Sequence, residues 1–276
     1  MSYIFEPNKR YRMPTHFGPS LGPRQGLDGR LFPCTDTPYG TLIQATFKAD
    51  AQQLEKHLPP KFEVREPSTI NLCFLYRTRM EWLAGRGYNE FGVTVPVTYQ
   101  SSDGPIEGNL LLVIWENLAD AIITGREDLG VAKLFCDIPV PQHLGNDVVC
   151  RASWDGHQFA SLTLKGLKEG TAENLPASLE TAGTFHYKYM PRTNIPGEAD
   201  AHYVVLAPDD TPNGKLDRVR LANNASAQFQ PSTFEQLPTL VHIINALSAI
   251  ELGECVEANI INYHGGKDLS DMRIVD

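Results

Sequence analysis

The stretch GREDLGVAKLF at residues 125–135 places one lysine among apolar neighbours. Lys133 stands between VA and LF, downstream of the apolar run NLLLVIWENLADAIIT at 109–124 and just before CDIPV. Burying an ammonium is costly unless it is paired or gives up its proton, and no adjacent residue can pair this one. Lys133 is therefore either a side chain whose stem follows apolar surface to water, or a desolvated amine.

The desolvated amine is the interpretation that carries chemistry. Such an amine, with a lowered pKa, is neutral near pH 7 and attacks a carbonyl to form a Schiff base. Gly125 and Gly130 would let the backbone bend so that the Lys133 side chain enters a cavity. The residues of this stretch alone leave both interpretations open.

Composition narrows the class of protein. The 276 residues are 42% hydrophobic and 21% charged, which is typical of a globular protein with a substantial core. A net charge of −9 without a Lys/Arg run argues against nucleic acid or an anionic membrane surface as the main partner. No apolar stretch is long enough to span a bilayer, and MSYIFEPNKRYRMP at 1–14 lacks the apolar core of a signal peptide. We therefore expect a cytoplasmic protein that does not bind membranes.

Specific motifs for common cofactors and metals are missing from the sequence. It contains no GxGxxG, P-loop, HExxH or GxSxG motif, which argues against dinucleotide, nucleotide, zincin and serine-hydrolase sites. Five scattered cysteines without a CxxC pair predict free thiols rather than disulfides or a zinc site. The histidines share no ligand spacing, and we interpret each as a surface or satisfied core residue: His143, His157, His186, His202 and His242. No metal and no organic cofactor are expected.

Short runs rich in Val, Ile, Thr and aromatic residues recur along the chain between Gly, Asp and Pro signals. WDGH at 154–157 is typical of a tight hairpin turn. Helical patterns are few: 49–58, part of 116–127, and 234–250, which Pro238 interrupts. Strands are expected at 41–47, 70–76, 92–99, 109–115, 148–154, 157–164, 184–190, 202–207 and 256–263.

This pattern predicts a strand-dominated α+β fold, either a barrel or a large curved sheet with a few peripheral helices. Residues 1–40 are rich in Pro and Gly and are expected to form an irregular N-terminal arm. No repeat or linker divides the chain, so we predict a single domain over 1–276.

Three ordered segments point to a known family. GREDLGVAK at 125–133 combines Gly-Arg-Glu with a lysine at a fixed spacing. YNEFGVTVPV at 88–97 reads Tyr-x-Glu-x-Gly-x-x-x-Pro-Val, and FKADAQQLEKHLPPKFEVREP at 47–67 reads as a helix, a proline stop and a strand. Together these segments resemble the acetoacetate decarboxylase superfamily over roughly residues 40–140, and KYMPR at 188–192 fits more loosely.

The resemblance implies a large curved antiparallel sheet that closes into a cone-like β-barrel with a Schiff-base lysine in its interior. Lys133 falls on that lysine, whose depressed pKa is a property of the family. Glu90 falls on the family's active-site glutamate, which positions substrate or moves a proton. Arg126 and Glu127 belong to the Gly-Arg-Glu signature, and we expect them to form structural ion pairs. Family members assemble, so a homo-oligomer is expected.

Three positions depart from the family's pattern. A second lysine that follows the Schiff-base lysine in characterised decarboxylases is Leu134 here. An arginine that holds the substrate carboxylate is replaced by Gly40, and an acidic position in the second strand is Leu72. Without the second lysine, a low pKa of Lys133 would have to come from desolvation by its apolar neighbours in sequence, Val131, Ala132, Leu134 and Phe135.

Other residues are candidates for substrate binding. A β-keto acid needs a cationic partner, and a bidentate arginine is the usual one. Arg77 or Arg79 in YRTRM, or Arg192 in MPRT, would substitute for the missing arginine. The candidate hydroxyl donors are Tyr76, Tyr88 and Tyr263.

These residues predict a cofactor-independent lyase that acts on a small carbonyl substrate. In the leading hypothesis a Lys133 iminium accepts the electron pair left by CO₂ loss from an acetoacetate-like β-keto acid. The same iminium serves an aldolase-dehydratase or cyclase acting on pyruvate-like or other carbonyl compounds. A third hypothesis is a non-catalytic barrel that binds an apolar carbonyl ligand, with Lys133 reaching water.

Overall fold

The computed structural model describes residues 5–175 and 181–275 and consists mostly of strands. The 12-stranded large sheet has the order β10 (Lys168–Gly170), β13 (Lys215–Leu221), β15 (Cys255–His264), β1 (Tyr39–Lys48), β3 (Thr69–Met80), β4 (Arg86–Ser101), β5 (Gly104–Glu116), β11 (Gly183–Pro191), β12 (Ala199–Pro208) and β16 (Arg273–Val275), with β2 (Phe62–Val64) on β4 and β6 (Lys133–Phe135) on β5. The 4-stranded small sheet has the order β14 (Asn224–Phe229), β9 (His157–Lys165), β8 (Asp147–Trp154) and β7 (Gln142–Leu144).

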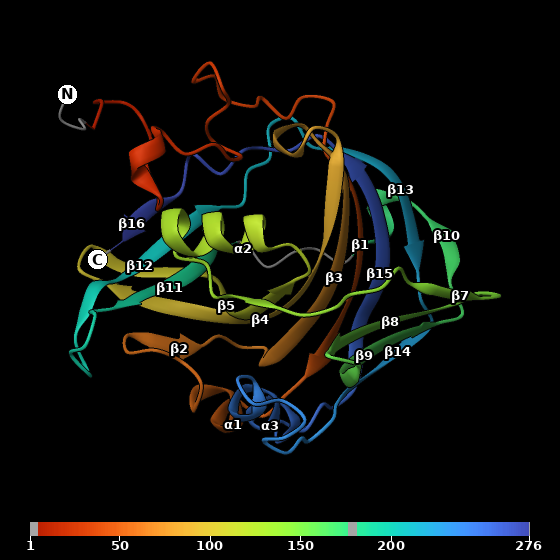
Figure 1. Ribbon diagram of the computed structural model, residues 1–276. Helices are drawn as coiled ribbons and strands as arrows, with labels where there is room; N and C mark the ends of the chain where they lie inside the picture. The colour runs from red at the N-terminus through yellow and green to blue at the C-terminus, as the bar shows by residue number, and fades with distance from the viewer. Residues whose placement is uncertain (1–4, 176–180, 276) are drawn as a thin grey trace.

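The helical segments are short and peripheral. Figure 1 shows α1 and α3 at one end of the molecule and the N-terminal arm at the opposite end, on the same side as α2. The α-helices are α1 (Ala51–Glu55), α2 (Ala119–Thr124) and α3 (Val241–Ser248), and a π-helical turn, η3 (Gly125–Leu129), directly follows α2. Single 3-10 turns are η1 (Thr15–Phe17), η2 (Glu81–Leu83) and η4 (Ala172–Asn174).

The large sheet is curved but open in the part of the chain that the structure describes, so a closed cone-like barrel is not confirmed. Its path ends at β10 and β16, and no pairing joins these two edges. The sheet is also mixed rather than wholly antiparallel, because β6 and β11 both pair with β5 in parallel. A parallel neighbour requires a crossover, and the chain makes the one to β6 through α2 and η3. This crossover brings Lys133 to the sheet.

The predicted helices are confirmed in shortened form. Asp50 caps α1, where its side chain accepts a hydrogen bond from the Gln53 backbone N–H at 2.9 Å. Helix α3 starts at Val241, after Pro238, so only the last part of that predicted segment is helical. Helix α2 lies within the predicted segment 116–127 and continues into η3. π-helical turns are rare in proteins, and many of those that occur lie at functional sites.

Every predicted strand lies within an observed one: β1, β3, β4, β5, β8, β9, β11, β12 and β15. The hairpin turn is confirmed too, since Asp155 and Gly156 have φ values of 47° and 80° between β8 and β9. β13 and β14 lie outside the predicted strands because KLDRVRL and NASAQF are mostly polar and lack a clear β pattern.

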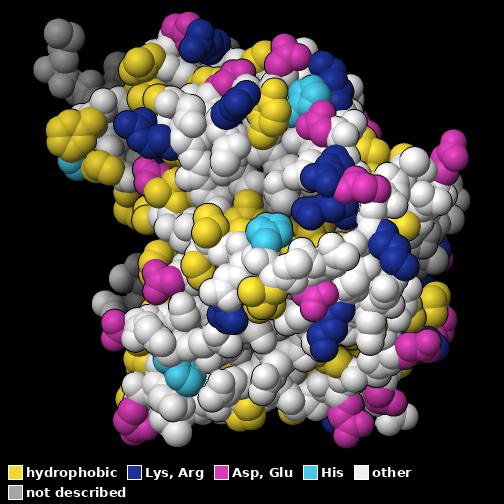
Figure 2. Space-filling view, turned by 90° about the vertical axis from the view of Figure 1, so that its right-hand side faces the viewer, with side chains coloured by type: hydrophobic (Ala, Val, Ile, Leu, Met, Phe, Trp, Pro, Cys, Tyr) yellow, Lys and Arg dark blue, Asp and Glu magenta, His cyan; other side chains and the backbone are white. Residues whose placement is uncertain are grey.

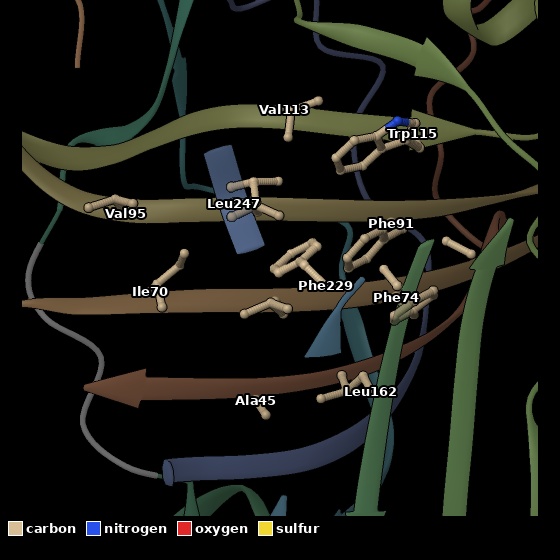
Figure 3. Packing of buried hydrophobic residues seen from close by; sticks show 14 of the residues in the cluster. Ala45, Ile70, Phe74, Phe91, Val95, Val113, Trp115, Leu162, Phe229 and Leu247 are labelled. Carbon is tan, nitrogen blue, oxygen red and sulfur yellow. The ribbon is translucent and has the colours of Figure 1, made fainter. Parts of the chain in front are cut away.

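The hydrophobic core lies between the large sheet, the small sheet and α3. Phe74, Phe91 and Trp115 are register partners on β3, β4 and β5, and neighbouring rings stack with centroids 4.3 and 5.3 Å apart. Phe159 on β9 lies 5.4 Å from Trp115, and Phe229 on β14 packs nearby (Figure 3). Because side chains alternate along a strand, the residues next to each of these aromatics in sequence point to the other face of β3, β4 and β5.

The surface carries charges of both signs, and the cysteines are unpaired as the sequence predicts. On the face in Figure 2, Lys and Arg side chains are interspersed with Asp and Glu. Among the described residues, no helix has the length and apolar content needed to cross a membrane. All five cysteines are free thiols, and Cys136 and Cys150 are buried.

Candidate active site

A cavity of about 680 Å³ lies on the face of β3, β4 and β5 opposite the aromatic core. The other walls come from β1, β6, β11, β12, β13 and β15, from the α2–η3 segment, from the N-terminal arm and from residues 265–269. Leu111, Ile114, Leu129 and Val131 form an apolar part of the lining. Its volume lies in the range of sites for small organic molecules.

Four charged side chains from four neighbouring strands line this cavity. Arg77 lies on β3, Glu90 on β4, Glu116 on β5 and Lys133 on β6. Arg77 Nε donates to Glu90 Oε1 at 2.9 Å, and Lys133 Nζ lies 2.6 Å from Glu116 Oε1. Glu90 and Glu116 are direct register partners. The row thus has a cation at each end and two carboxylates in the middle.

Lys133 is paired by the sheet and not by its sequence neighbours. In the parallel β5–β6 ladder it lies opposite Ile114 and therefore beside Glu116, whose side chain is fully buried. Lys133 Nζ also donates to the Ala121 carbonyl at 3.1 Å, and only 13% of the side chain is exposed. The lysine head is therefore enclosed with a carboxylate partner, which the local sequence does not reveal.

The apolar neighbours of Lys133 contribute less than the sequence suggested. Val131 lines the cavity, but Leu134 packs against the core and Phe135 is 46% exposed. Alternation along β6 turns the residue after Lys133 to the other face of the sheet. The apolar wall comes instead from β5 and η3.

Glu116 has the properties of a proton carrier. Burial raises the pKa of Glu116 to about 7, against the opposing effect of the Lys133 ammonium and with a further rise from Glu90. Within the described residues its Oε2 has no hydrogen-bond partner. A carboxyl group that titrates near neutral pH in contact with an amine can take up and return a proton.

Gly125 makes room for the lysine. Its φ of −68° is ordinary helical geometry, so glycine is not required there for a bend. A Cβ at Gly125 would lie 2.3 Å from Lys133 Cε and 2.8 Å from Lys133 Nζ. The Lys133 side chain therefore packs directly against the Gly125 backbone, in the space that a larger residue's Cβ would occupy. Gly130 does serve the backbone: it ends η3 with a φ of 80°.

The position of the missing arginine is filled by a tyrosine ring. Gly40 pairs with Arg77 on one side and Tyr263 on the other, and its Cβ would lie 2.3 Å from Tyr263 Cζ. Arg77 is thus the cation beside this position, and within the described residues its Nη groups form no hydrogen bond. Burial raises the pKa of Tyr88 and of Tyr263, so both cavity-lining phenols stay protonated near neutral pH.

Three of the candidate substrate-binding residues lie away from the cavity. Tyr76 alternates with Arg77 on β3 and points into the core, where its hydroxyl faces Cys150. Arg192 is exposed at the β11–β12 end and pairs with Glu198 and Asp200. Arg79 stacks on a tyrosine ring with its Cζ 4.4 Å from the ring centroid. Leu72, at the family's acidic position, is also in the core.

The Gly-Arg-Glu signature supports the backbone of the site. Arg126 Nη1 donates to the Lys133 carbonyl at 2.9 Å, and the Glu127 carbonyl accepts from Lys188 Nζ at 2.7 Å. Neither side chain forms an ion pair with any described residue, so the expected ion-pairing role is wrong in detail. Arg126 acts through a backbone hydrogen bond that ties η3 to β6.

Three of the polar cavity residues that bear on its chemistry lie in no recognisable sequence motif. Glu116 is flanked by Trp and Asn in an apolar run, and only its register opposite Glu90 reveals its role. His186 was interpreted as a surface or satisfied residue, but it is 6% exposed and Nδ1 has no partner within the described chain. Burial, with the Lys133 charge, lowers the pKa of His186 to about 3, so its ring is neutral. Arg24 comes from the arm and carried no sequence signal.

A family profile described as Acetoacetate decarboxylase (ADC) matches residues 12–258. An acetoacetate decarboxylase structure from Legionella pneumophila shares 17% identity at a TM-score of 0.64, over 89% of this chain and 90% of that one. An acetoacetate decarboxylase-like enzyme from Sphingomonas wittichii RW1 shares 16% identity at a TM-score of 0.60, over 84% and 92% of the two chains.

A third similar structure is the enduracididine biosynthesis enzyme MppR complexed with pyruvate. It shares 14% identity at a TM-score of 0.63, over 90% of this chain and 94% of that one. At identities this low the structural likeness shows a common fold. None of the curated proteins compared with the chain matches it.

Proposed function

This chain belongs to the acetoacetate decarboxylase family, and from that premise we propose that it is a Schiff-base lyase with Lys133 as its nucleophile. The observation that carries the proposal is the 2.6 Å contact between Lys133 Nζ and Glu116 Oε1 at the wall of a cavity. An enclosed amine beside a carboxyl that titrates near pH 7 is suited to attack on a carbonyl, because the proton has a place to go.

Imine formation uses both members of the pair. Glu116 takes a proton from Lys133, and the free amine adds to the substrate carbonyl to give a carbinolamine. Glu116 then protonates the carbinolamine hydroxyl, which leaves as water, and the protonated imine remains on Lys133. The neutral His186 ring, with a free Nδ1 in the cavity wall, is a hydrogen-bond partner for the departing water.

For a β-keto acid the next step is loss of CO₂. Arg77 holds the carboxylate through its Nη groups while Nε stays on Glu90. The C–C bond breaks, its electron pair moves into the iminium, and an enamine forms as CO₂ departs. Glu116, which gave up its proton in the dehydration step, takes up another from solvent and passes it to the enamine carbon. Hydrolysis of the resulting imine releases the ketone and restores Lys133.

Aldol condensation with dehydration is the second candidate. Two carboxyl groups on register partners, one with a pKa near 7, provide the acid and the base that dehydration needs. A neighbouring structure is MppR complexed with the condensation product of pyruvate and imidazole 4-carboxaldehyde. The cavity of about 680 Å³ has room for two small carbonyl compounds.

Reductive trapping tests the proposal. The protein is incubated with acetoacetate, pyruvate or a ketone and treated with borohydride, and the adduct is mapped by peptide mass spectrometry. We expect a covalent adduct on Lys133 that Lys133→Ala abolishes. Lys215→Ala is the matched control, since Lys215 also lines the cavity but is 53% exposed and paired with Asp36.

The outcomes separate the three hypotheses. CO₂ release from acetoacetate by the trapping-competent protein supports decarboxylation, and a dehydrated product from pyruvate plus an aldehyde supports the aldol route. An adduct that persists in Lys133→Ala, or no adduct with any carbonyl compound, would overturn the Schiff-base proposal and leave a binding function.

A further inference from the structure

The cations that line the cavity differ in how their charges are neutralised. Lys133 has Glu116, Arg77 has Glu90, Lys215 has Asp36, and Lys267 has Asp271. The remaining cavity cation comes from the N-terminal arm and has no carboxylate of its own among the described residues. This cation is the guanidinium of Arg24.

Within the part of the chain that the structure describes, Arg24 has one acidic partner and shares it with another arginine. Its Nη2 lies 2.7 Å from Asp128 Oδ2, and Arg12 Nη1 lies 2.9 Å from the same oxygen. Two guanidinium groups and one carboxylate leave an excess positive charge. The Arg24 side chain is only 3% exposed, and its Nε is buried without a hydrogen-bond partner in the described chain. A buried charge in this state is costly unless a further anion reaches it.

The position of Arg24 ties it to the nucleophile. Its Nη2 lies 3.4 Å from the Thr124 carbonyl, and the next residue, Gly125, is the one that the Lys133 stem crosses. Through these contacts and ordinary bond lengths, the guanidinium lies within about 12 Å of Lys133 Nζ. The apolar side chains of Leu129 and Val131 line the same cavity. A cation, an apolar wall and an amine suit a ligand with a hydrocarbon spacer.

We propose that Arg24 binds a second anionic group of the substrate, so that the substrate class is oxo-dicarboxylates rather than four-carbon monoacids. This proposal rests on the proposed Schiff-base function for one end of the ligand. Arg77 takes the carboxylate next to the reacting carbonyl, and Arg24 takes the carboxylate at the far end of the chain. The cavity volume agrees, because about 680 Å³ is far more than a four-carbon keto acid fills. Arg24 is then a specificity-determining residue contributed by the arm.

A matched pair of substrates tests this assignment. We compare kcat/KM and the rate of borohydride trapping for 3-oxohexanoate and 3-oxohexanedioate, which differ only by the terminal carboxylate. The wild-type protein is expected to prefer the diacid by about ten- to hundredfold, the usual value of a charged hydrogen bond. Arg24→Gln removes this preference by weakening the diacid alone, and Arg24→Lys retains part of it.

Arg12→Gln is the control variant. Arg12 binds the same Asp128 oxygen but does not line the cavity, so it reports damage to the arm without loss of the cavity cation. We expect it to keep part of the preference for the diacid, because the Arg24 guanidinium stays in the cavity although Asp128 then pairs with it alone. Equal loss for monoacid and diacid in Arg24→Gln, or complete loss of the preference in Arg12→Gln, would overturn the assignment.

A binding measurement separates this inference from the Schiff-base proposal. Hexanedioate has two carboxylates and no ketone, so it cannot form an imine. Calorimetric titration is expected to show tighter binding of hexanedioate than of hexanoate to the wild-type protein and to Lys133→Ala, but not to Arg24→Gln. If trapping fails while this difference persists, the lysine chemistry is wrong and the anion site stands. If trapping succeeds without the difference, the anion site is wrong.

Discussion

The two faces of β3, β4 and β5 are made by alternate residues of the same strands, and they have opposite chemistry. On the core face, Phe74, Phe91 and Trp115 stack in one register row and are fully buried. On the cavity face, the adjacent row places Glu90 opposite Glu116. A shift of one residue along each strand thus changes an aromatic stack into a pair of carboxylates.

This difference assigns stability and chemistry to different faces. The aromatic row gains free energy from burial of apolar area and from ring stacking. The carboxylate row costs stability, because desolvated charges are only partly repaid by their partners. Variants on the two faces should therefore fail in different ways, and four experiments test that separation.

Trp115→Ala should have the largest effect, on the core face. Deleting a fully buried tryptophan is expected to lower the free energy of unfolding by about 3–5 kcal/mol. Urea unfolding at fixed pH measures the loss. The molecules that remain folded should still form the trapped adduct on Lys133, and a loss below about 1 kcal/mol would contradict the view of this row as the core.

Glu116→Gln should alter how stability depends on pH. The pKa of Glu116 is raised from 4.5 to about 7, so the folded state binds this proton more tightly than the unfolded state. Stability from this group is fully present below about pH 4.5 and is lost as pH rises through 7, up to about 3 kcal/mol. Urea unfolding of both proteins between pH 4.5 and 8 should show that the variant lacks this decline.

The same pH series has an internal control. Glu257→Gln removes another partly buried carboxyl whose pKa is raised by burial but which lies on β15, outside the cavity lining. It should leave the pH 7 step intact. Parallel stability curves for wild type and Glu116→Gln would show that Glu116 does not titrate in this range.

Gly125→Ala should separate activity from stability on the cavity face. Gly125 has helical φ and ψ, so alanine there raises helix propensity, yet its Cβ would overlap the Lys133 stem. Displacing the nucleophile by about 1 Å is expected to lower the trapping rate about a hundredfold. Asp120→Ala, at an exposed position of α2, is the matched control and should trap normally. Normal trapping by Gly125→Ala would mean that the lysine stem takes another path.

A tyrosine pair provides the smallest effect. Tyr88 lines the cavity, whereas Tyr76 points into the core. Tyr88→Phe should slow turnover about tenfold through loss of one hydrogen bond, and Tyr76→Phe should leave turnover unchanged. Steady-state kinetics on both variants measures the contrast. Equal slowing by both would indicate that the two faces are coupled through the sheet.

The predicted strands and Lys133 are features that local sequence patterns can identify. Alternating apolar residues and turn signals located most of the strands that carry the core, because side-chain alternation along a strand is visible in the sequence. β2 and β14, which also contribute core residues, lie outside the predicted strands. Lys133 and Glu90 lie in motifs of contiguous residues, and both line the cavity. Tyr88, Arg77 and Tyr263 also line it, so the type of residue was a useful guide at these positions.

Strand register decides the position of the residues that local sequence patterns do not predict. Tyr76 and Arg77 are neighbours in sequence, and only the direction of the pleat decides which of them enters the cavity. Glu116 meets Lys133 and Glu90 only because β6 pairs with β5 in parallel and β4 pairs with β5 in antiparallel fashion. Arg192 is in a plausible motif but pairs at the surface with Glu198 and Asp200.

The sequence by itself determined the strand content, the family resemblance and the identity of the candidate lysine, because each depends on residues close together in the chain. The tertiary structure decided what surrounds that lysine. It supplied Glu116 from a parallel neighbour, space from Gly125, and Arg24 from the arm. These contacts join residues far apart in sequence, and their free energy depends on burial and distance, which no local pattern encodes.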